Sequence, residues 1–247
     1  MKKTIIILIV ITVAILLIFM LITDKIDLSE YQTSFDYGSL SKEQIEVMNS
    51  ILLCGANGDT NIKQDLSQEE FDEVIEYIGL YFGSTLAYKN VALWRPEYAV
   101  ANVELLRKLE QDKAIIDTKI DSILSNMYEG TDEFKLLQIS NYLTKTIKYS
   151  YLLDDIEPLS GLYGKGSCMT YSMLFYKMAT RIGIQTCICY GKADNGERVA
   201  LHAWNMVVLD GERYFYDITW YDTIVRDLRY IHSRTVWGRN FKTYIKW

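Results

Sequence analysis

The sequence predicts an α+β protein, because patterns typical of helices fill its first part and patterns typical of strands dominate its second part. Between residues 41 and 147, apolar residues recur at the three- and four-residue spacing of helices with one buried face. Apolar, strand-like segments then cover residues 184–193, 198–209 and 212–220, and a glycine-containing turn separates the last two. An uncharged apolar segment precedes both parts.

That N-terminal segment covers residues 5–22 and follows Lys2 and Lys3. A helix of this length, at ~1.5 Å per residue, spans most of the ~30 Å hydrocarbon core of a membrane. Cleavable signal peptides have shorter apolar stretches and a cleavage site between small residues. We therefore expect residues 1–24 to form an uncleaved signal-anchor helix; a signal peptide and a buried core helix are the alternatives. The two lysines favour a cytoplasmic N-terminus, with the rest of the chain outside the cell membrane.

The remainder divides into a helix-rich region, residues 25–110, and a domain of helices and strands, residues 111–247. A first helix is predicted to begin after Ser41, with Gln44 three residues later as its capping-box partner, and to break at a glycine-rich stretch from residue 55. Ser67 is the predicted cap of a second helix.

Further elements follow along the chain. Residues 91–94 are strand-like, and a long helix, continuous or broken, is predicted over about residues 99–127. Another helix is expected to begin at Thr131. Residues 168–182 have the pattern of a helix with one buried face, and Gly183 is well suited to end it.

The last two strands allow a test of their register. Residues 210–211 have the sequence DG, which is a strong signal for a two-residue hairpin turn. Pairing outward from this turn places Trp204 opposite Asp217 and His202 opposite Thr219. Because side chains alternate between faces, all four are expected on one face of the sheet. His202 and Asp217 are then diagonal neighbours, ~7–8 Å apart along the backbone and within bridging reach.

Both faces of this hairpin are largely apolar, so both should be covered. We expect the helix over residues 168–182 to cover the face that carries His202. Asp217 is then partly buried, where an unpaired carboxylate is costly, and a nearby His202 explains its presence. Trp204 is expected to shield the pair from water.

Cys168 completes a candidate nucleophile, base and orienter with His202 and Asp217. Cys168 is the last residue of the sequence GKGSC, residues 164–168, and lies at a predicted helix start. The free N–H groups and the helix dipole at such a position favour a thiolate. Gly166 is expected to leave the approach to the thiol open. Taken singly, a buried cysteine or histidine is more often structural. Their order in the chain and the shared face favour a catalytic group.

Composition excludes several other classes of function. The net charge is −6, and no basic block lies beyond the N-terminus, so nucleic acid is not an expected partner. Cys187 and Cys189 share a strand face and are interpreted as small buried residues. With two histidines in the chain, metal ligands are too few, and no cofactor is predicted.

Several motifs resemble the transglutaminase-like superfamily, whose members share a papain-like Cys-His-Asp core. They are GSC at residues 166–168 with Tyr171 three residues on, HAWN at residues 202–205, and DITW at residues 217–220 followed by Asp222. The resemblance covers about the last 140 residues. It implies an α+β fold in which a helix bearing the cysteine packs on an antiparallel sheet bearing the histidine and the aspartate.

By this resemblance, Cys168 is the nucleophile, His202 the general base and acid, and Asp217 the orienter of His202. Tyr163 is a candidate oxyanion donor. The chain has the sequence MT at residues 169–170, where many relatives carry glycine or tryptophan.

The sequence therefore predicts a membrane-anchored thiol acyl-transfer enzyme outside the cytoplasm. It would attack an amide, form a thioester on Cys168 and pass the acyl group to water or to an amine. The expected substrates are peptide or protein amides, cell-wall peptides among them. The alternative is a non-catalytic surface module for binding or assembly that retains the same fold.

Overall fold

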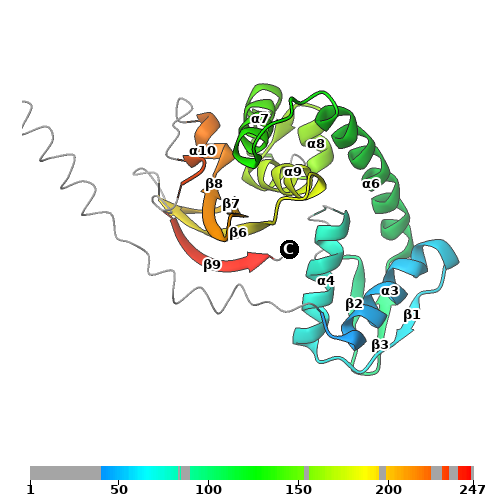
Figure 1. Ribbon diagram of the computed structural model, residues 1–247. Coiled ribbons are helices and arrows are strands. Elements are labelled where there is room, and N and C mark those ends of the chain that lie inside the picture. The colour runs from blue at the N-terminus through cyan, green and yellow to red at the C-terminus, as the bar shows by residue number, and fades with distance from the viewer. Residues whose placement is uncertain are drawn as a thin grey trace, which may run out of the picture.

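The protein consists of two parts that are joined by one long helix, as Figure 1 shows. The computed structural model describes residues 40–82, 84, 90–152, 156–194, 199–223, 230–233 and 239–245. Each part combines helices with a principal antiparallel sheet, which confirms the predicted α+β class. The predicted signal-anchor, residues 1–24, lies outside the described residues. Within the described part of the chain, no helix has the length and apolar character needed to cross a membrane.

The first part packs two helices beside a small sheet. The helices are α3 (Lys42–Asn57) and α4 (Gln68–Phe82), and the strand order is β1 (Asn61–Lys63), β3 (Tyr98–Ala101) and β2 (Ala92–Trp94). The predicted capping box is present, because Gln44 N donates to Ser41 Oγ at 3.1 Å and Ser41 N donates to Gln44 Oε1 at 2.9 Å. α3 continues past the predicted break and ends at Gly58, whose φ is +80°.

The long helix α6 (Val103–Leu124) begins later than predicted, because residues 99–101 belong to β3, the central strand of the small sheet. The Asn102 side chain accepts a hydrogen bond from Leu105 N at 3.1 Å and caps the helix. The predicted boundary at residue 110 therefore lies inside one continuous helix.

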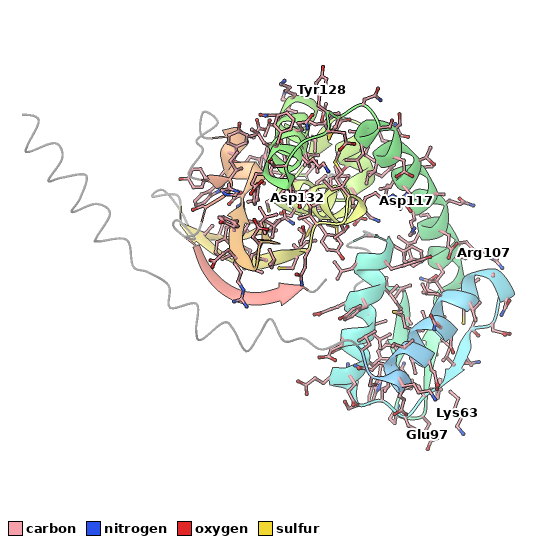
Figure 2. All side chains as sticks on the ribbon, in the orientation of Figure 1. Lys63, Glu97, Arg107, Asp117, Tyr128 and Asp132 are labelled. Carbon is pink, nitrogen blue, oxygen red and sulfur yellow. The ribbon has the colours of Figure 1, made fainter. Side chains whose placement is uncertain are left out.

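Each half of α6 packs in a different core. Leu106 and Leu109 are buried with α3 and α4, whereas Ile116 and Ile120 are buried with the second part. Figure 2 labels Arg107 and Asp117 on α6: Arg107 Nε donates to Gly55 O of α3 at 2.8 Å, and Asp117 lies 3.7 Å from Lys177 Nζ of α9 (Cys168–Arg181). α6 thus fixes the two parts to each other.

The second part surrounds a four-stranded antiparallel sheet in the order β8-β7-β6-β9. Its strands are β6 (Thr186–Asp194), β7 (Val199–Leu209), β8 (Glu212–Tyr216) and β9 (Arg239–Ile245). The remaining elements are α7 (Asp132–Thr146), β4 (Lys148–Tyr149), α8 (Pro158–Leu162), β5 (Lys165–Gly166), α9 and α10 (Ile218–Thr223). As predicted, α7 follows Thr131 as its cap, α9 begins at Cys168, and Gly183 follows its end with a φ of +83°. The sequence did not indicate β9.

The hairpin of β7 and β8 has the predicted register but a shorter second strand. Leu209 pairs with Glu212 across the two-residue turn, and the pairing continues to Asn205 and Tyr216. The predicted strand extends to residue 220; the observed strand ends because Asp217 Oδ1 accepts a hydrogen bond from Trp220 N at 3.0 Å and so caps α10. The expected pairing of His202 with Thr219 therefore does not form.

The helix α9 covers the opposite face of the sheet from the one expected. Asn205 Nδ2 donates to Ser172 O of α9 at 3.0 Å, and Phe175 of α9 stacks on Tyr216 with ring centroids 5.2 Å apart. Strand alternation puts His202 on the other face from Asn205. The core under α9 is formed by buried residues of α6, α7, α9 and the sheet: Ile120, Leu136, Ile139, Leu143, Leu174, Phe175, Met178, Val207 and Leu209.

Candidate active site

The candidate site lies at the edge of β7, beyond the point where β8 ends. In an antiparallel hairpin, the N–H groups of every second residue point to the same neighbouring strand. The two-residue turn makes Leu209 and Glu212 a hydrogen-bonded pair, so the N–H of Ala203 also points to the β8 side. Ala203 lies beyond the last β7–β8 pair, and its N–H donates to the sulfur of Cys168. The sulfur of Cys168 thus lies at the edge of β7, where a longer β8 would otherwise pair.

The start of α9 is held by a cap and by a short parallel strand pair. Ser167 N donates to Thr170 Oγ1 at 3.1 Å, and Gly166 pairs with Tyr149 of β4. A Cβ atom at Gly166 would lie 2.6 Å from Thr170 Cγ2. Gly166 is therefore required for the packing of the cap, which is a different role from the open approach to Cys168 that the sequence suggested.

His202 and Asp217 form the predicted pair. Their Nε2 and Oδ2 atoms are 2.8 Å apart, and their side chains are 7% and 0% exposed. His202 also shares a hydrogen bond with the Cys168 thiol. Because Nε2 faces Asp217, the ring nitrogen available to the thiol is Nδ1. The structure therefore brings all three predicted residues together in the order Cys168–His202–Asp217.

Two indole rings lie nearly parallel to the imidazole of His202. Trp204 is fully buried, with its ring centroid 5.9 Å from that of His202, and Trp220 lies at 5.4 Å. Trp204 is therefore buried beside His202, and its role as a shield against water stays a prediction. The sequence analysis did not predict that Trp220 lies beside His202. The position of Trp220 three residues after Asp217 is typical of a helix cap and could have indicated it.

The surroundings of Cys168 and His202 favour a charged thiolate and a charged imidazolium. Burial alone would raise the pKa of Cys168, but the hydrogen bond and charge of His202, with the Ala203 N–H, outweigh burial and lower it. Burial alone would lower the pKa of His202, but the charge and hydrogen bond of Asp217 outweigh burial and raise it to about 9. Opposite shifts of this kind stabilise a thiolate next to an imidazolium between the two pKa values.

Tyr163, the predicted oxyanion donor, follows α8 and is 68% exposed. Lys119 Nζ lies 4.8 Å from the centre of its ring. The contacts of Tyr163 do not test an oxyanion role, which stays a prediction.

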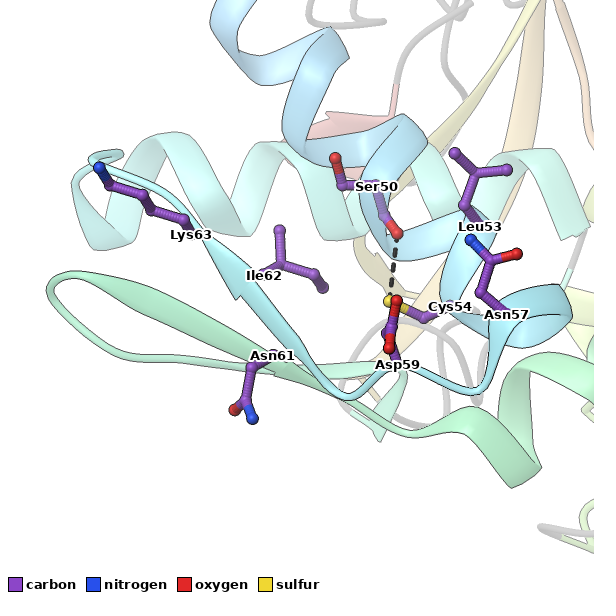
Figure 3. Close-up of a pocket in the computed structure, with 8 residues that line it drawn as sticks. All are labelled: Ser50, Leu53, Cys54, Asn57, Asp59, Asn61, Ile62 and Lys63. Carbon is purple, nitrogen blue, oxygen red and sulfur yellow. Dashed lines mark hydrogen bonds between the residues drawn. The ribbon is translucent and has the colours of Figure 1, made fainter.

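The other cysteines have environments unlike that of Cys168. Figure 3 shows Cys54 at a cavity of about 380 Å³, where its sulfur donates to Ser50 O at 3.2 Å. Burial, and then the charge of Asp59, raise the pKa of Cys54. Cys187 and Cys189 are buried with sulfurs 3.9 Å apart, as the sequence suggested. Across the described ranges, no three His, Cys, Asp or Glu side chains gather as a possible metal site.

The substitution Asp217→Asn is expected to lower the pKa of His202, because it removes the charge that raises it. Cys168 then loses its imidazolium partner at neutral pH, and the pKa of its thiol rises. A rise of about one unit slows alkylation ~10-fold at a pH below both values. Iodoacetamide rates at Cys168 from pH 5 to pH 9, followed by peptide mass spectrometry, measure this shift. Asp121→Asn, at an exposed carboxylate bound to Arg181 of α9, is the control; identical profiles for wild type and Asp217→Asn would contradict the account.

Part of the chain is similar to known proteins. Residues 122–220 match the family model of the transglutaminase-like superfamily, and this segment includes Cys168, His202 and Asp217. No curated protein matches the chain. A crystal structure of a candidate cysteine protease from Cytophaga hutchinsonii is similar, with 12% identity, 53% of this chain and 46% of that chain covered, and a TM-score of 0.37. A crystal structure of a TGase has 13% identity, with 66% of this chain and 50% of that chain covered, and a TM-score of 0.41.

The chain therefore spans about half the length of each of these two structures. The family match rests on the segment from the end of α6 to Trp220, which contains the nucleophile helix α9 and the hairpin of β7 and β8. Members of this superfamily are typically Cys-His-Asp enzymes. The chain is thus an α+β protein whose residues 122–220 are similar to the core of the transglutaminase-like superfamily.

Proposed function

We propose that the protein is a thiol acyl-transfer enzyme that attacks amide bonds, with Cys168 as nucleophile, His202 as general base and acid, and Asp217 as orienter of His202. The observation that carries this proposal is the hydrogen-bonded chain from half-buried Cys168 to buried His202 and Asp217, with the 2.8 Å contact between His202 and Asp217. The opposite pKa shifts of Cys168 and His202 supply a nucleophile and an acid at the same pH.

In the first half of the reaction, the Cys168 thiolate attacks the amide carbonyl carbon, and a C–S bond forms. The N–H groups in the first turn of α9 point toward the start of the helix, where they are suited to stabilise the oxyanion that develops. The imidazolium of His202 then gives its proton to the amide nitrogen, the C–N bond breaks and the amine leaves. The acyl group is now a thioester on Cys168, and His202 is neutral.

In the second half, neutral His202 removes a proton from the acceptor, which attacks the thioester carbon. The C–S bond breaks, and the Cys168 thiolate returns next to the imidazolium. Asp217 keeps its charge and holds the ring throughout. Water as acceptor gives hydrolysis, and an amine gives cross-linking.

The residues after the nucleophile differ from those of many relatives, and the structure gives both of them a role. Met169 packs against a small cluster that Leu80 of α4 forms with Met173 and Ile188. Thr170 is buried and accepts the cap hydrogen bond at the start of α9. The hydrogen-bonded triad stands beside this departure from the family pattern, which supports the catalytic proposal over a non-catalytic module.

An activity-based thiol probe is expected to label the wild-type protein at neutral pH and to spare Cys168→Ala. Cys54→Ala is the matched control, because the raised pKa of Cys54 keeps that thiol protonated, and labelling should persist. Intact-protein mass spectrometry counts the labels. Failure of the folded wild type to react, or labelling that survives Cys168→Ala, would reject the proposal and favour a non-catalytic surface module for binding or assembly.

We further propose that the enzyme is anchored in the cell membrane by residues 1–24 and acts outside the cytoplasm on peptide or protein amides, including cell-wall peptides. The uncharged apolar segment after Lys2 and Lys3 supports this location. A variant without residues 1–24 is expected in the soluble fraction after cell lysis, whereas the full chain sediments with membranes. Sedimentation of the truncated variant with membranes would contradict the anchor.

A further inference from the structure

We propose that Tyr171 and Asp222 form a hydrogen-bonded strut that holds α10 against the nucleophile helix α9, and that both are positioning residues for the triad. Tyr171 Oη donates to Asp222 Oδ2 at 2.7 Å. The proposal rests on the proposed function of Cys168, His202 and Asp217, since it concerns how these three are held in register.

The strut joins the two helices that carry opposite ends of the triad. Tyr171 lies one turn after Cys168 on α9, and Asp222 lies near the end of the six-residue helix α10. Asp217 caps the other end of α10 and holds His202. This hydrogen bond therefore connects the turn that carries the thiol to the helix that positions the acid.

The hydrogen bond matters for the position of Asp217 because β8 ends at Tyr216. Asp217 therefore lies outside the β7–β8 ladder and is not held by strand pairing there. Asp217 N donates to Tyr230 O at 2.6 Å, which fixes the backbone of the acid but does not involve α9. Tyr221 Oη donates to Asn141 Oδ1 of α7 at 3.1 Å, which ties α10 to a different helix. The strut sets the position of α10 relative to the nucleophile.

Tyr171 is a rigid donor. Its side chain is fully buried, its hydroxyl also lies 2.8 Å from Ile147 O, and its ring stacks on Tyr149 with centroids 6.5 Å apart. Burial, and then the hydrogen bond and charge of Asp222, raise the pKa of Tyr171 well above its usual range. The phenol therefore keeps its proton wherever the triad is active, and the strut persists across the working pH.

The substitution Tyr171→Phe removes the hydroxyl and keeps the ring. We expect the iodoacetamide rate at Cys168 near neutral pH to fall by about 10- to 100-fold, as for other small misplacements of reacting groups. We also expect the pH midpoint of alkylation to rise, because His202, which Asp217 orients, is no longer aligned with the thiol. Asp222→Ala should reproduce both effects, and the double variant should be no slower than the slower single variant.

Matched variants separate positioning from general destabilisation. Asp222→Asn keeps an oxygen that accepts from Tyr171, so it should recover most of the rate that Asp222→Ala loses. Tyr221→Phe removes the phenol hydroxyl of another buried tyrosine, which lies on α10 itself and binds α7, and should leave the pH midpoint unchanged. Circular dichroism establishes that each variant is folded. If Tyr171→Phe does not fold, the half-buried Asp222 carries the test through its Ala and Asn variants.

The outcomes distinguish this inference from the proposed function. A wild-type Cys168 with the pH midpoint of an ordinary thiol would reject the thiolate–imidazolium pair and, with it, the proposed function. A low wild-type midpoint that is unchanged in folded Tyr171→Phe and Asp222→Ala would reject the strut alone. An equal shift in Tyr221→Phe would also overturn it, because the effect would then follow from any loosening of α10.

Discussion

The ladder between β7 and β8 stops at Asn205 and Tyr216, and the candidate site is built from what lies beyond this stop. A longer β8 would occupy the edge of β7 that the sulfur of Cys168 now reaches through the Ala203 N–H. It would also keep Asp217 in the strand, where its carboxylate could not cap α10. The short strand thus makes room for the nucleophile and, in the same step, turns the acid toward His202.

Burial strengthens the interactions among the three charged groups, and it also makes each charge unfavourable when it is unpaired. The buried imidazolium and carboxylate and the half-buried thiolate are each unfavourable alone. In series they offset one another: Asp217 stabilises the charge on His202, and His202 stabilises the charge on Cys168. The rings of Trp204 and Trp220 lie along the imidazole and limit the water that would weaken these interactions. Removal of one of the three side chains therefore changes how well the charges on the other two are stabilised.

Local signals in the sequence identified much of this site. The Asp-Gly turn fixed the register of the hairpin, and alternation along β7 then put His202 and Asp217 within reach of each other. Helix caps at Ser41 and Thr131, and the glycine after α9, were predicted from residue type alone. Each of these features depends on contacts within a few residues or across one turn.

The features that the sequence did not predict depend on distant contacts. Both faces of the hairpin are apolar, so composition did not indicate that α9 packs on the side of Asn205. The end of β8 depends on the capping of α10 by Asp217, in a segment whose residues would also suit a strand. β3 is four residues long and is stabilised by two flanking strands, so it was interpreted as part of a helix. Tyr171 and Asp222 are 51 positions apart, and no local pattern joins them.

The proposed chemistry depends on the charge of His202, and ¹⁵N NMR of histidine-labelled protein measures this charge directly. The chain has two histidines, so a His232→Gln variant assigns both signals. The account predicts that His202 is an imidazolium at pH 7 and loses its proton near pH 9, and that Cys168→Ala lowers this midpoint. A neutral His202 ring at pH 7, with a midpoint at or below the ordinary value of about 6.5, would contradict the account.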